Sequence, residues 1–91
     1  MFYLVSYDIP DDKRRTKLAK AIKDFGDRVQ YSVFECILDH ELLGQMKERI
    51  ASIIDTAEDS VRIYTLCASC EARIQIIGQG DISRIEDVYI V

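Results

Sequence analysis

The segment from residue 2 to residue 9 is the feature that most constrains the fold of this chain. It is rich in β-branched and aromatic residues and is predicted to form a strand. One face of that strand presents Tyr3, Val5, Tyr7 and Ile9, and the other presents Phe2, Leu4, Ser6 and Asp8. Both faces are largely apolar, so each is expected to pack against another element or another chain. A chain of 91 residues forms one domain that buries only roughly 60% of its unfolded surface, and it therefore gains from a partner.

Two segments carry apolar residues at helical spacing. The first follows Pro10, Asp11 and Asp12, where an Asp side chain can cap a helix, and it ends at Gly26. The second follows Asp39. Their apolar residues are Leu18, Ala21, Ile22 and Phe25 in the first, and Leu42, Leu43, Met46, Ile50, Ile53 and Ile54 in the second. Two helices can cover only one face of a sheet, so we expect both on the same face.

The remaining segments are predicted to be strands and turns. Residues 28–38 form a strand region in which the alternation of apolar and polar residues is interrupted near Ser32. We expect a bulge or a division into two strands there. Residues 60–67 and 72–77 are predicted to form a hairpin. After a glycine-containing loop at residues 78–81, a short strand near residues 88–91 closes the chain.

This order of strands and helices indicates an α+β fold. It fits a ferredoxin-like sandwich, in which two helices lie on one face of an antiparallel sheet. We assign residues 1–80 to this domain and residues 81–91 to a C-terminal strand arm. A second copy of the chain is the most economical cover for the face that the helices leave open. We therefore predict a homodimer packed sheet to sheet.

The chain is acidic overall but basic in one stretch. The net charge is −4, and no run approaches the roughly 18 apolar residues of a membrane span. The N-terminus has neither the basic start nor the cleavage site of a signal peptide, so we expect a cytoplasmic protein without membrane contact. Residues 13–28 nevertheless hold seven basic and two acidic residues. This stretch is either an ordinary solvated helix face or a contact for phosphate backbones.

Asp8 ends the first predicted strand, next to the basic stretch and on the face expected to meet the partner copy. In a two-fold dimer the two Asp8 carboxylates could approach each other, which is unfavourable unless a proton or a cation lies between them. Carboxylate and water ligands suit Mg²⁺ or Mn²⁺, and such an ion can activate water against a phosphodiester. The alternative is that Asp8 caps the following helix or turn.

The three cysteines do not predict a disulfide framework. Cys36 lies in an apolar run and is expected in the core. Cys67 and Cys70 form a Cys-x-x-Cys pair at the predicted hairpin turn, and one pair per chain is too few ligands for a closed zinc site. A redox role would need the pair at the start of a helix that follows a strand, which the predicted hairpin lacks. The sequence has no phosphate-binding glycine loop and no Ser/His/Asp signature, so it does not support nucleotide hydrolysis or acyl transfer.

Two segments together resemble the CRISPR-associated protein two (Cas2) family. They are Tyr-Asp-Ile-Pro-Asp-Asp-Lys-Arg-Arg-Thr-Lys-Leu at residues 7–18 and Gln-Tyr-Ser-Val-Phe-Glu at residues 30–35. The resemblance in length and strand order covers nearly the whole chain. It implies a ferredoxin-like homodimer that acts with the CRISPR integrase, Cas1, in the acquisition of new spacers. It also implies Mg²⁺-dependent endonuclease activity on single-stranded RNA or double-stranded DNA.

The resemblance also implies roles for individual residues. Asp8 corresponds to the metal-binding, catalytic aspartate of the family, and Tyr7 beside it is the second candidate catalytic residue. Lys17 stands where some members have Arg, so it keeps the charge but not the bidentate fork. The residues expected at nucleic acid are Lys13, Arg14, Arg15, Lys17 and Arg28, with Ser32 and Phe34 supporting the site. The C-terminal arm is expected to pack on the partner protomer.

Two hypotheses for function follow. In the first, the chain is a metal-dependent nuclease in which Asp8 from both protomers holds one Mg²⁺ and Tyr7 orients water or supports the carboxylate. In the second, the dimer is a non-catalytic adaptor that clamps DNA in the spacer-integration complex, and Asp8 only shapes the interface. Core packing of Tyr7 and dimer packing of Phe34 are the alternatives for those two side chains. A toxin-like ribonuclease or small-ligand domain would share the fold but not the two motifs.

Overall fold

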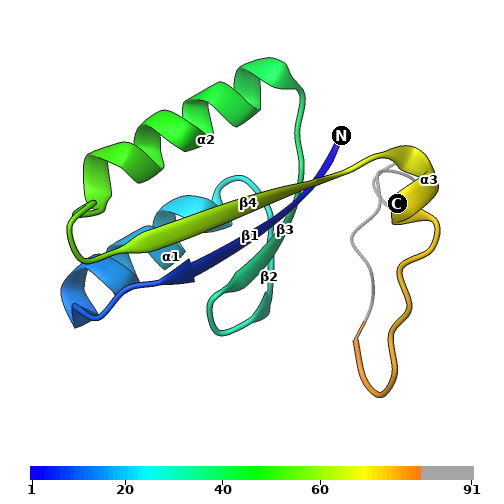
Figure 1. Cartoon of the computed structure of the whole chain (residues 1–91), viewed down its shortest axis with the longest axis horizontal. Coiled ribbons are helices and arrows are strands. Elements are labelled where there is room, and N and C mark those ends of the chain that lie inside the picture. Colours follow the sequence, from blue (N-terminus) through cyan, green and yellow to red (C-terminus); the bar gives the residue numbers. More distant parts are fainter. Residues whose placement is uncertain (81–91) are drawn as a thin grey trace.

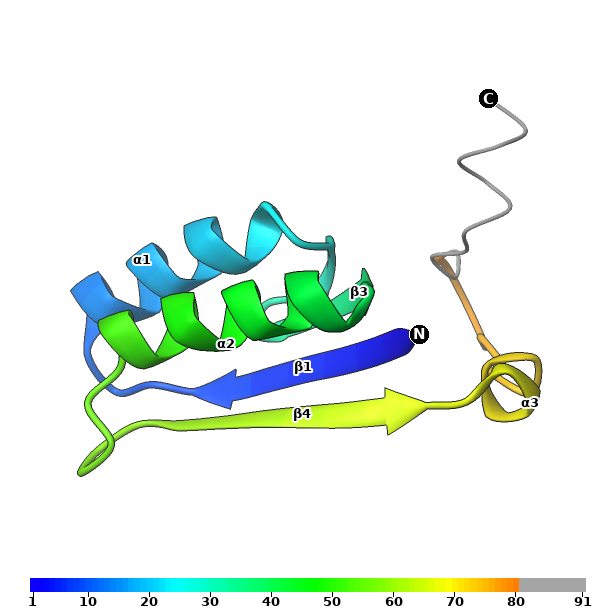
Figure 2. The ribbon, with the colours of Figure 1, turned by 90° about the horizontal axis from the view of Figure 1, so that it is seen from above.

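Strand β1 (Phe2–Asp8) lies inside a four-stranded antiparallel sheet whose strand order is β2-β3-β1-β4 (Figure 1). The computed structural model describes residues 1–80. The other elements are α1 (Asp12–Lys23), β2 (Asp27–Gln30), β3 (Val33–Ile37), α2 (His40–Ile53), β4 (Ser60–Leu66) and the short α3 (Ala68–Glu71). Both long helices cover the same face of the sheet (Figure 2). The predicted ferredoxin-like α+β fold is thus confirmed.

Both long helices begin at an aspartate that caps them. The Asp11 side chain accepts a hydrogen bond from the Arg14 amide at 2.8 Å, and Asp39 does the same for the Leu42 amide at 2.8 Å. An Asp side chain is favoured here because it satisfies one of the amides that have no partner within the helix. The cap of α1 is therefore Asp11 and not Asp8, which excludes the capping alternative for Asp8 at this helix.

The second strand region divides near Ser32, as the slip in its alternation predicted. β2 ends at Gln30 and β3 begins at Val33, and their pairing is irregular between Arg28 and Gln30. The Tyr7 amide donates to the Ser32 carbonyl oxygen at 3.1 Å, so the turn between the two strands is held against the end of β1. This contact positions the β2–β3 hairpin beside Asp8.

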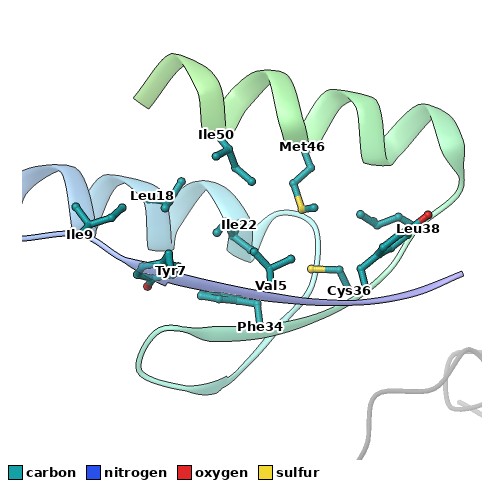
Figure 3. Packing of buried hydrophobic residues seen from close by; sticks show 11 residues of the cluster. Val5, Tyr7, Ile9, Leu18, Ile22, Phe34, Cys36, Leu38, Met46 and Ile50 are labelled. Carbon is teal, nitrogen blue, oxygen red and sulfur yellow. The ribbon is translucent and has the colours of Figure 1, made fainter. Parts of the chain in front are cut away.

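The core lies between the helices and one face of β1. Tyr3, Val5, Tyr7 and Ile9 are all buried, as their alternation predicted. They pack with side chains from α1, β3 and α2, which include Leu18, Phe34, Cys36 and Met46 (Figure 3). Leu18, Met46, Val5 and Cys36 have no measurable exposure, and cores packed this densely tolerate little change in volume. Cys36 is thus a core residue, as expected.

The predicted hairpin at residues 60–77 is wrong in its second half. β4 is present, but residues 72–77 form no strand, and Cys67 occupies the N-cap position of the short helix α3 instead of lying in a hairpin turn. Alanine at 68 and 72 and glutamate at 71 favour a helical turn over a strand. Amide-to-carbonyl bonds from Arg73 to Cys70 and from Ile74 to Glu71 tighten the chain and end that helix after one turn.

The predicted C-terminal arm at residues 81–91 and the strand predicted near residues 88–91 lie outside the described residues. Within residues 1–80, no helix combines the length and the apolar character needed to cross a bilayer.

An ion pair joins α1 to the segment that leads into β4. The Arg14 Nε donates to Asp59 Oδ2 at 2.8 Å, and Arg14 Nη2 reaches both Asp59 and the exposed Glu58. The Asp59 side chain is fully buried and also accepts from the Asp55 amide at 2.8 Å. Because these bonds stabilise the ionised carboxylate, they lower the pKa of Asp59 below its ordinary value. Asp59 and Arg14 thereby fix β4 and α1 on either side of the end of β1.

The close approach at Gly26 gives a first test of this packing. A methyl group at Gly26 would overlap the Glu35 carbonyl oxygen and the Cys36 sulfur, both of which the sheet holds in place. We expect Gly26→Ala to lower the free energy of unfolding by about 1–3 kcal/mol, measured by urea denaturation. Gly44 lies within α2 with nothing within 4 Å of the added methyl, so Gly44→Ala is the control and should stabilise by about 0.5–1 kcal/mol. Equal effects of the two substitutions would contradict the described packing.

The Asp59 ion pair predicts a pH-dependent contribution to stability. A carboxyl whose pKa is lowered on folding stabilises the protein above its unfolded pKa, and this contribution is lost as pH falls through the folded pKa. We therefore expect Asp59→Asn to be less stable than the parent protein at pH 7, with the difference shrinking below about pH 4. Glu58→Gln removes the exposed partner and should change stability by less than about 1 kcal/mol. Thermal unfolding of the three proteins from pH 7 to pH 3 measures both effects, and a difference that does not change with pH would contradict this role of Asp59.

Candidate nucleic-acid and metal site

A cavity of about 650 Å³ lies at the end of β1, between α1 and the β2–β3 hairpin. Its lining residues are Tyr7, Asp8, Ile9, Arg15, Thr16, Ala19, Lys20, Lys23, Arg28, Tyr31, Ser32 and Phe34. Among these residues one side chain is acidic and four are basic. The cavity therefore combines a carboxylate with a surface that attracts anions.

Asp8 is the acidic residue of this cavity. It is the last residue of β1 and pairs with Ser60, the first residue of β4, so its backbone is fixed by the sheet. Its side chain is exposed, and among residues 1–80 no hydrogen bond or ion pair holds its carboxylate. Asp8 is thus a positioned carboxylate whose oxygens are open to a ligand.

Tyr7 and Phe34 support the cavity from the core. Tyr7 is 5% exposed and its hydroxyl donates to the Tyr31 carbonyl oxygen at 3.1 Å. Phe34 is 1% exposed and stacks on Tyr7 with 6.3 Å between ring centroids. Phe34 therefore faces the helices of its own chain, and at this exposure its ring offers no open face to a nucleobase.

Arg28 links the hairpin to the cavity. Its Nε donates to the Tyr31 carbonyl oxygen at 2.9 Å, and its guanidinium lies 5.8 Å from the centre of the Phe34 ring. These contacts restrict the side chain while leaving Arg28 exposed. Tyr31, which supplies that carbonyl, is itself 90% exposed at the tip of the hairpin.

Helix α1 provides the other three basic groups of the cavity. Arg15 is held by a hydrogen bond from Nη1 to the Ile9 carbonyl oxygen at 2.9 Å and by an ion pair with Asp12. Lys20 and Lys23 are exposed, and neither forms a salt bridge within residues 1–80. Both lysines belong to the basic stretch at residues 13–28 but are not among the predicted site residues. Their spacing from Thr16, at i+4 and i+7, places all three on one helical face and is the signal that could have found them.

Three of the predicted nucleic-acid contacts lie outside this cavity. Lys13 and Lys17 are exposed on α1 but do not line it. Arg14 is bound to Asp59 and Glu58, and this pairing gives it a structural role in joining α1 to β4. The structure thus brings together Tyr7, Asp8, Arg15, Arg28, Ser32 and Phe34 from the predicted set.

The donor set of one chain fits a metal ion only in part. In residues 1–80 no group of three or more His, Cys, Asp or Glu side chains is placed to hold an ion. Mg²⁺ keeps several water ligands and needs only one or two carboxylates together with substrate phosphates. One open carboxylate per chain, beside basic groups suited to phosphate, is compatible with that requirement if a second Asp8 or a phosphate completes the set.

Comparison with known proteins relates nearly the whole chain to one family. The family model for CRISPR associated protein Cas2 matches residues 1–74. The protein named CRISPR-associated endoribonuclease Cas2 1 of Chloroflexus aurantiacus is 46% identical over 93 aligned positions, covering all of both chains. CRISPR-associated endonuclease Cas2 2 of Thermus thermophilus is 40% identical and covers 98% of this chain and 94% of its own.

Solved structures agree with the sequence comparison. The crystal structure of Streptococcus pyogenes Cas2 has a TM-score of 0.76 and 37% identity, covering 86% of this chain and all of that one. A chain of a partial Cas6-RT-Cas1–Cas2 complex has a TM-score of 0.73 and 31% identity, covering 84% of this chain and 89% of that one. Both the sequence and the fold therefore show that this chain belongs to the CRISPR-associated Cas2 family.

Proposed function

We propose that this protein is a cytoplasmic, metal-dependent endonuclease of CRISPR adaptation that cleaves phosphodiesters at Asp8. The observation that carries the proposal is the placement of one open carboxylate among four basic side chains at the end of a rigid strand. Relatives that align with this chain over nearly their whole length carry the names endoribonuclease and endonuclease, which supports a phosphodiester substrate. Single-stranded RNA and double-stranded DNA are the two substrates to compare.

Different residues of the cavity would bind phosphate and position the groups that do so in such a reaction. Arg28, Lys20 and Lys23 would bind phosphate oxygens, and Arg15 would do so with the part of its guanidinium that Ile9 and Asp12 leave open. Contacts of this kind are largely independent of base sequence and weaken with salt. Tyr7 acts as a positioning residue, because its hydroxyl holds the hairpin carbonyl that also receives Arg28.

Asp8 is the residue that would hold the metal ion. Mg²⁺ or Mn²⁺, when bound there, would supply an activated water and neutralise charge on the phosphate. Asp8 carries no competing hydrogen bond within residues 1–80, so its oxygens need not exchange a partner to bind an ion. Since one carboxylate per chain is few for such a site, we propose that Asp8 of a second protomer contributes.

The sheet face opposite the helices supports a homodimer. Cross-strand pairs on this face place Leu4 beside Tyr64 and Ser6 beside both Arg62 and Val33. Tyr64 is 47% exposed, and neither long helix covers this side (Figure 2). Packing this face against its copy would bury the tyrosine and the neighbouring apolar side chains, and it would bring the two β1 strands together. The match to a chain of a Cas1–Cas2 complex supports a further partnership with Cas1.

Removing the Asp8 charge tests the nuclease proposal. Asp8→Asn keeps the shape of the side chain but weakens its affinity for a metal ion. We expect cleavage with Mg²⁺ to fall by about 100-fold or more, while the dimer and its affinity for nucleic acid are retained. Purified parent and variant proteins would be assayed with and without Mg²⁺ on single-stranded RNA and double-stranded DNA, with binding and sedimentation recorded in parallel.

A matched control separates this effect from a general loss of acidity. Glu48 is exposed on α2 and does not line the cavity, so Glu48→Gln should cleave at the parent rate. If the parent and Asp8→Asn proteins bind duplex DNA and show no difference in cleavage, the nuclease proposal is wrong. The protein would then be the non-catalytic adaptor that clamps DNA.

Lysines of the cavity should contribute to affinity without affecting the fold. Lys20 and Lys23 are exposed, and their replacement by Gln keeps helix propensity. We expect the Lys20→Gln/Lys23→Gln double variant to reduce the slope of log affinity against log salt by about 2 on duplex DNA, close to one unit per phosphate contact. The control is Lys47→Gln on α2, outside the cavity, which should leave the slope unchanged. Equal slopes for all three proteins would contradict the assignment of this cavity to nucleic acid.

A further inference from the structure

Cys67 and Cys70 form a pair of thiols that the nuclease proposal does not use. Both are exposed and neither is in a disulfide, whereas Cys36 is buried in the core. They follow β4 directly, because Leu66 ends the strand and Cys67 caps α3. A strand followed at once by a Cys-x-x-Cys helical turn is the arrangement that the predicted hairpin lacked and the structure supplies.

The geometry of the turn places the backbones of the two cysteines close enough for a disulfide. The Glu71 amide donates to the Cys67 carbonyl oxygen at 2.8 Å, so Cys67 is the N-cap residue of the helical turn that residues 68–71 form. Residues three apart in such a turn have Cα atoms separated by about 5 Å, which lies inside the range of Cα separations in disulfides. A bond between the two sulfurs therefore needs side-chain rotation but no rearrangement of the backbone.

The surroundings of the two sulfurs make them unequal. The Cys67 sulfur lies 3.2 Å from the Ser69 hydroxyl oxygen. Hydrogen bonds from the Ser69 hydroxyl, the Cys70 amide and the Cys70 thiol lower the pKa of Cys67 to about 7. The same pairing raises the pKa of Cys70. Cys67 is thus the better nucleophile at neutral pH, and Cys70 is the thiol that keeps its proton.

We propose that Cys67 and Cys70 form a reversible dithiol–disulfide couple that exchanges with small disulfides. In the first step the Cys67 thiolate attacks one sulfur of a disulfide such as oxidised glutathione. The disulfide bond breaks, a mixed disulfide forms on Cys67, and one glutathione thiolate leaves and takes up a proton. In the second step Cys70 loses its proton to solvent and attacks the Cys67 sulfur, which releases the second glutathione. Two protein thiols are oxidised by two electrons and one glutathione disulfide is reduced to two thiols.

This couple lies at the opposite end of the sheet from Asp8. In the pairing of β1 with β4, Asp8 lies opposite Ser60 and Phe2 lies opposite Leu66, directly before Cys67. α3 projects beyond that far end of β4 (Figure 1). The redox site therefore shares no residue with the cavity, and its test is independent of nuclease activity.

Thiol exchange followed by mass spectrometry tests the proposal. The reduced full-length protein would be incubated without oxygen in buffers of reduced and oxidised glutathione at pH 7, quenched with acid and analysed as intact mass and as peptides. We expect the parent protein to lose two hydrogen atoms and to gain a bond between Cys67 and Cys70, with Cys36 still a thiol. Addition of dithiothreitol should restore the reduced mass.

Single substitutions assign the two roles. Cys70→Ser should stop at a glutathione mixed disulfide on Cys67, because no second thiol resolves it. Cys67→Ser should react with oxidised glutathione roughly fivefold more slowly at pH 7 than Cys70→Ser does. The reason is that the higher thiolate fraction of Cys67 outweighs its lower intrinsic nucleophilicity. Cys36 is the internal control in every variant and should remain a thiol, because it is buried in the core and burial raises its pKa to about 11.

Several results would overturn the proposal. These are glutathione adducts on both cysteines of the parent without ring closure, disulfides that only join two chains, and equal rates for Cys67→Ser and Cys70→Ser. Zinc added before oxidation distinguishes a metal role. If Zn²⁺ binds at one ion per two chains and blocks oxidation at stoichiometric concentration, the pair is half of a shared four-thiolate site and not a redox couple.

Discussion

The hydrogen bonding of β1 on both sides is the constraint on which the rest of this structure depends. β3 and β4 flank it, so its course is fixed along its length. Within this fixed strand, alternation sends Val5 and Tyr7 into the core and leaves Asp8 exposed where the strand ends. A carboxylate on a loop would move with the loop, whereas this one is held by the sheet and by the Tyr7 contacts with the hairpin. The same strand therefore builds the core and positions the open carboxylate of the cavity.

Much of this arrangement could be predicted from the sequence because it depends on local periodicity. The alternation of residues 2–9 predicted which side chains enter the core, and the aspartates at 11–12 and at 39 predicted caps for the two long helices, of which the structure selects Asp11 for α1. The slip near Ser32 predicted the division of the second strand region. The segment after β4 was misassigned because residues 72–77 alternate in the manner of a strand, while the helical preference of the preceding alanines and the tight bonds at Arg73 and Ile74 decide its structure. The hydrophobic pattern of the sequence does not indicate those backbone hydrogen bonds.

Which basic residues line the cavity was harder to predict, since this depends on contacts between segments that are distant in sequence. Arg14 and Lys20 look equivalent in the sequence, as basic residues of one helix. Asp59 lies 45 residues beyond Arg14 in sequence, and its buried carboxylate binds that guanidinium and leaves the lysines open to the cavity. Charge counting locates the basic helix, but only the fold shows which charges are already paired. The surroundings of Cys67 could not be predicted for the same kind of reason, because its contact with Ser69 depends on the helical turn after β4.

The balance of charge in the cavity constrains how a metal ion could enter it. Four basic side chains surround one carboxylate, so the cavity of a single chain repels a free cation more than Asp8 attracts it. Phosphate binding reverses this balance, because each phosphate that contacts Arg28 or a lysine adds negative charge beside Asp8. A second Asp8 from a partner protomer would act in the same direction. Metal affinity should therefore depend on bound nucleic acid and on the dimer, whereas affinity for nucleic acid does not need Asp8, whose charge opposes phosphate. The proposed catalytic role and the alternative clamping role would thus rely on different parts of one cavity, the carboxylate for cleavage and the basic groups for binding.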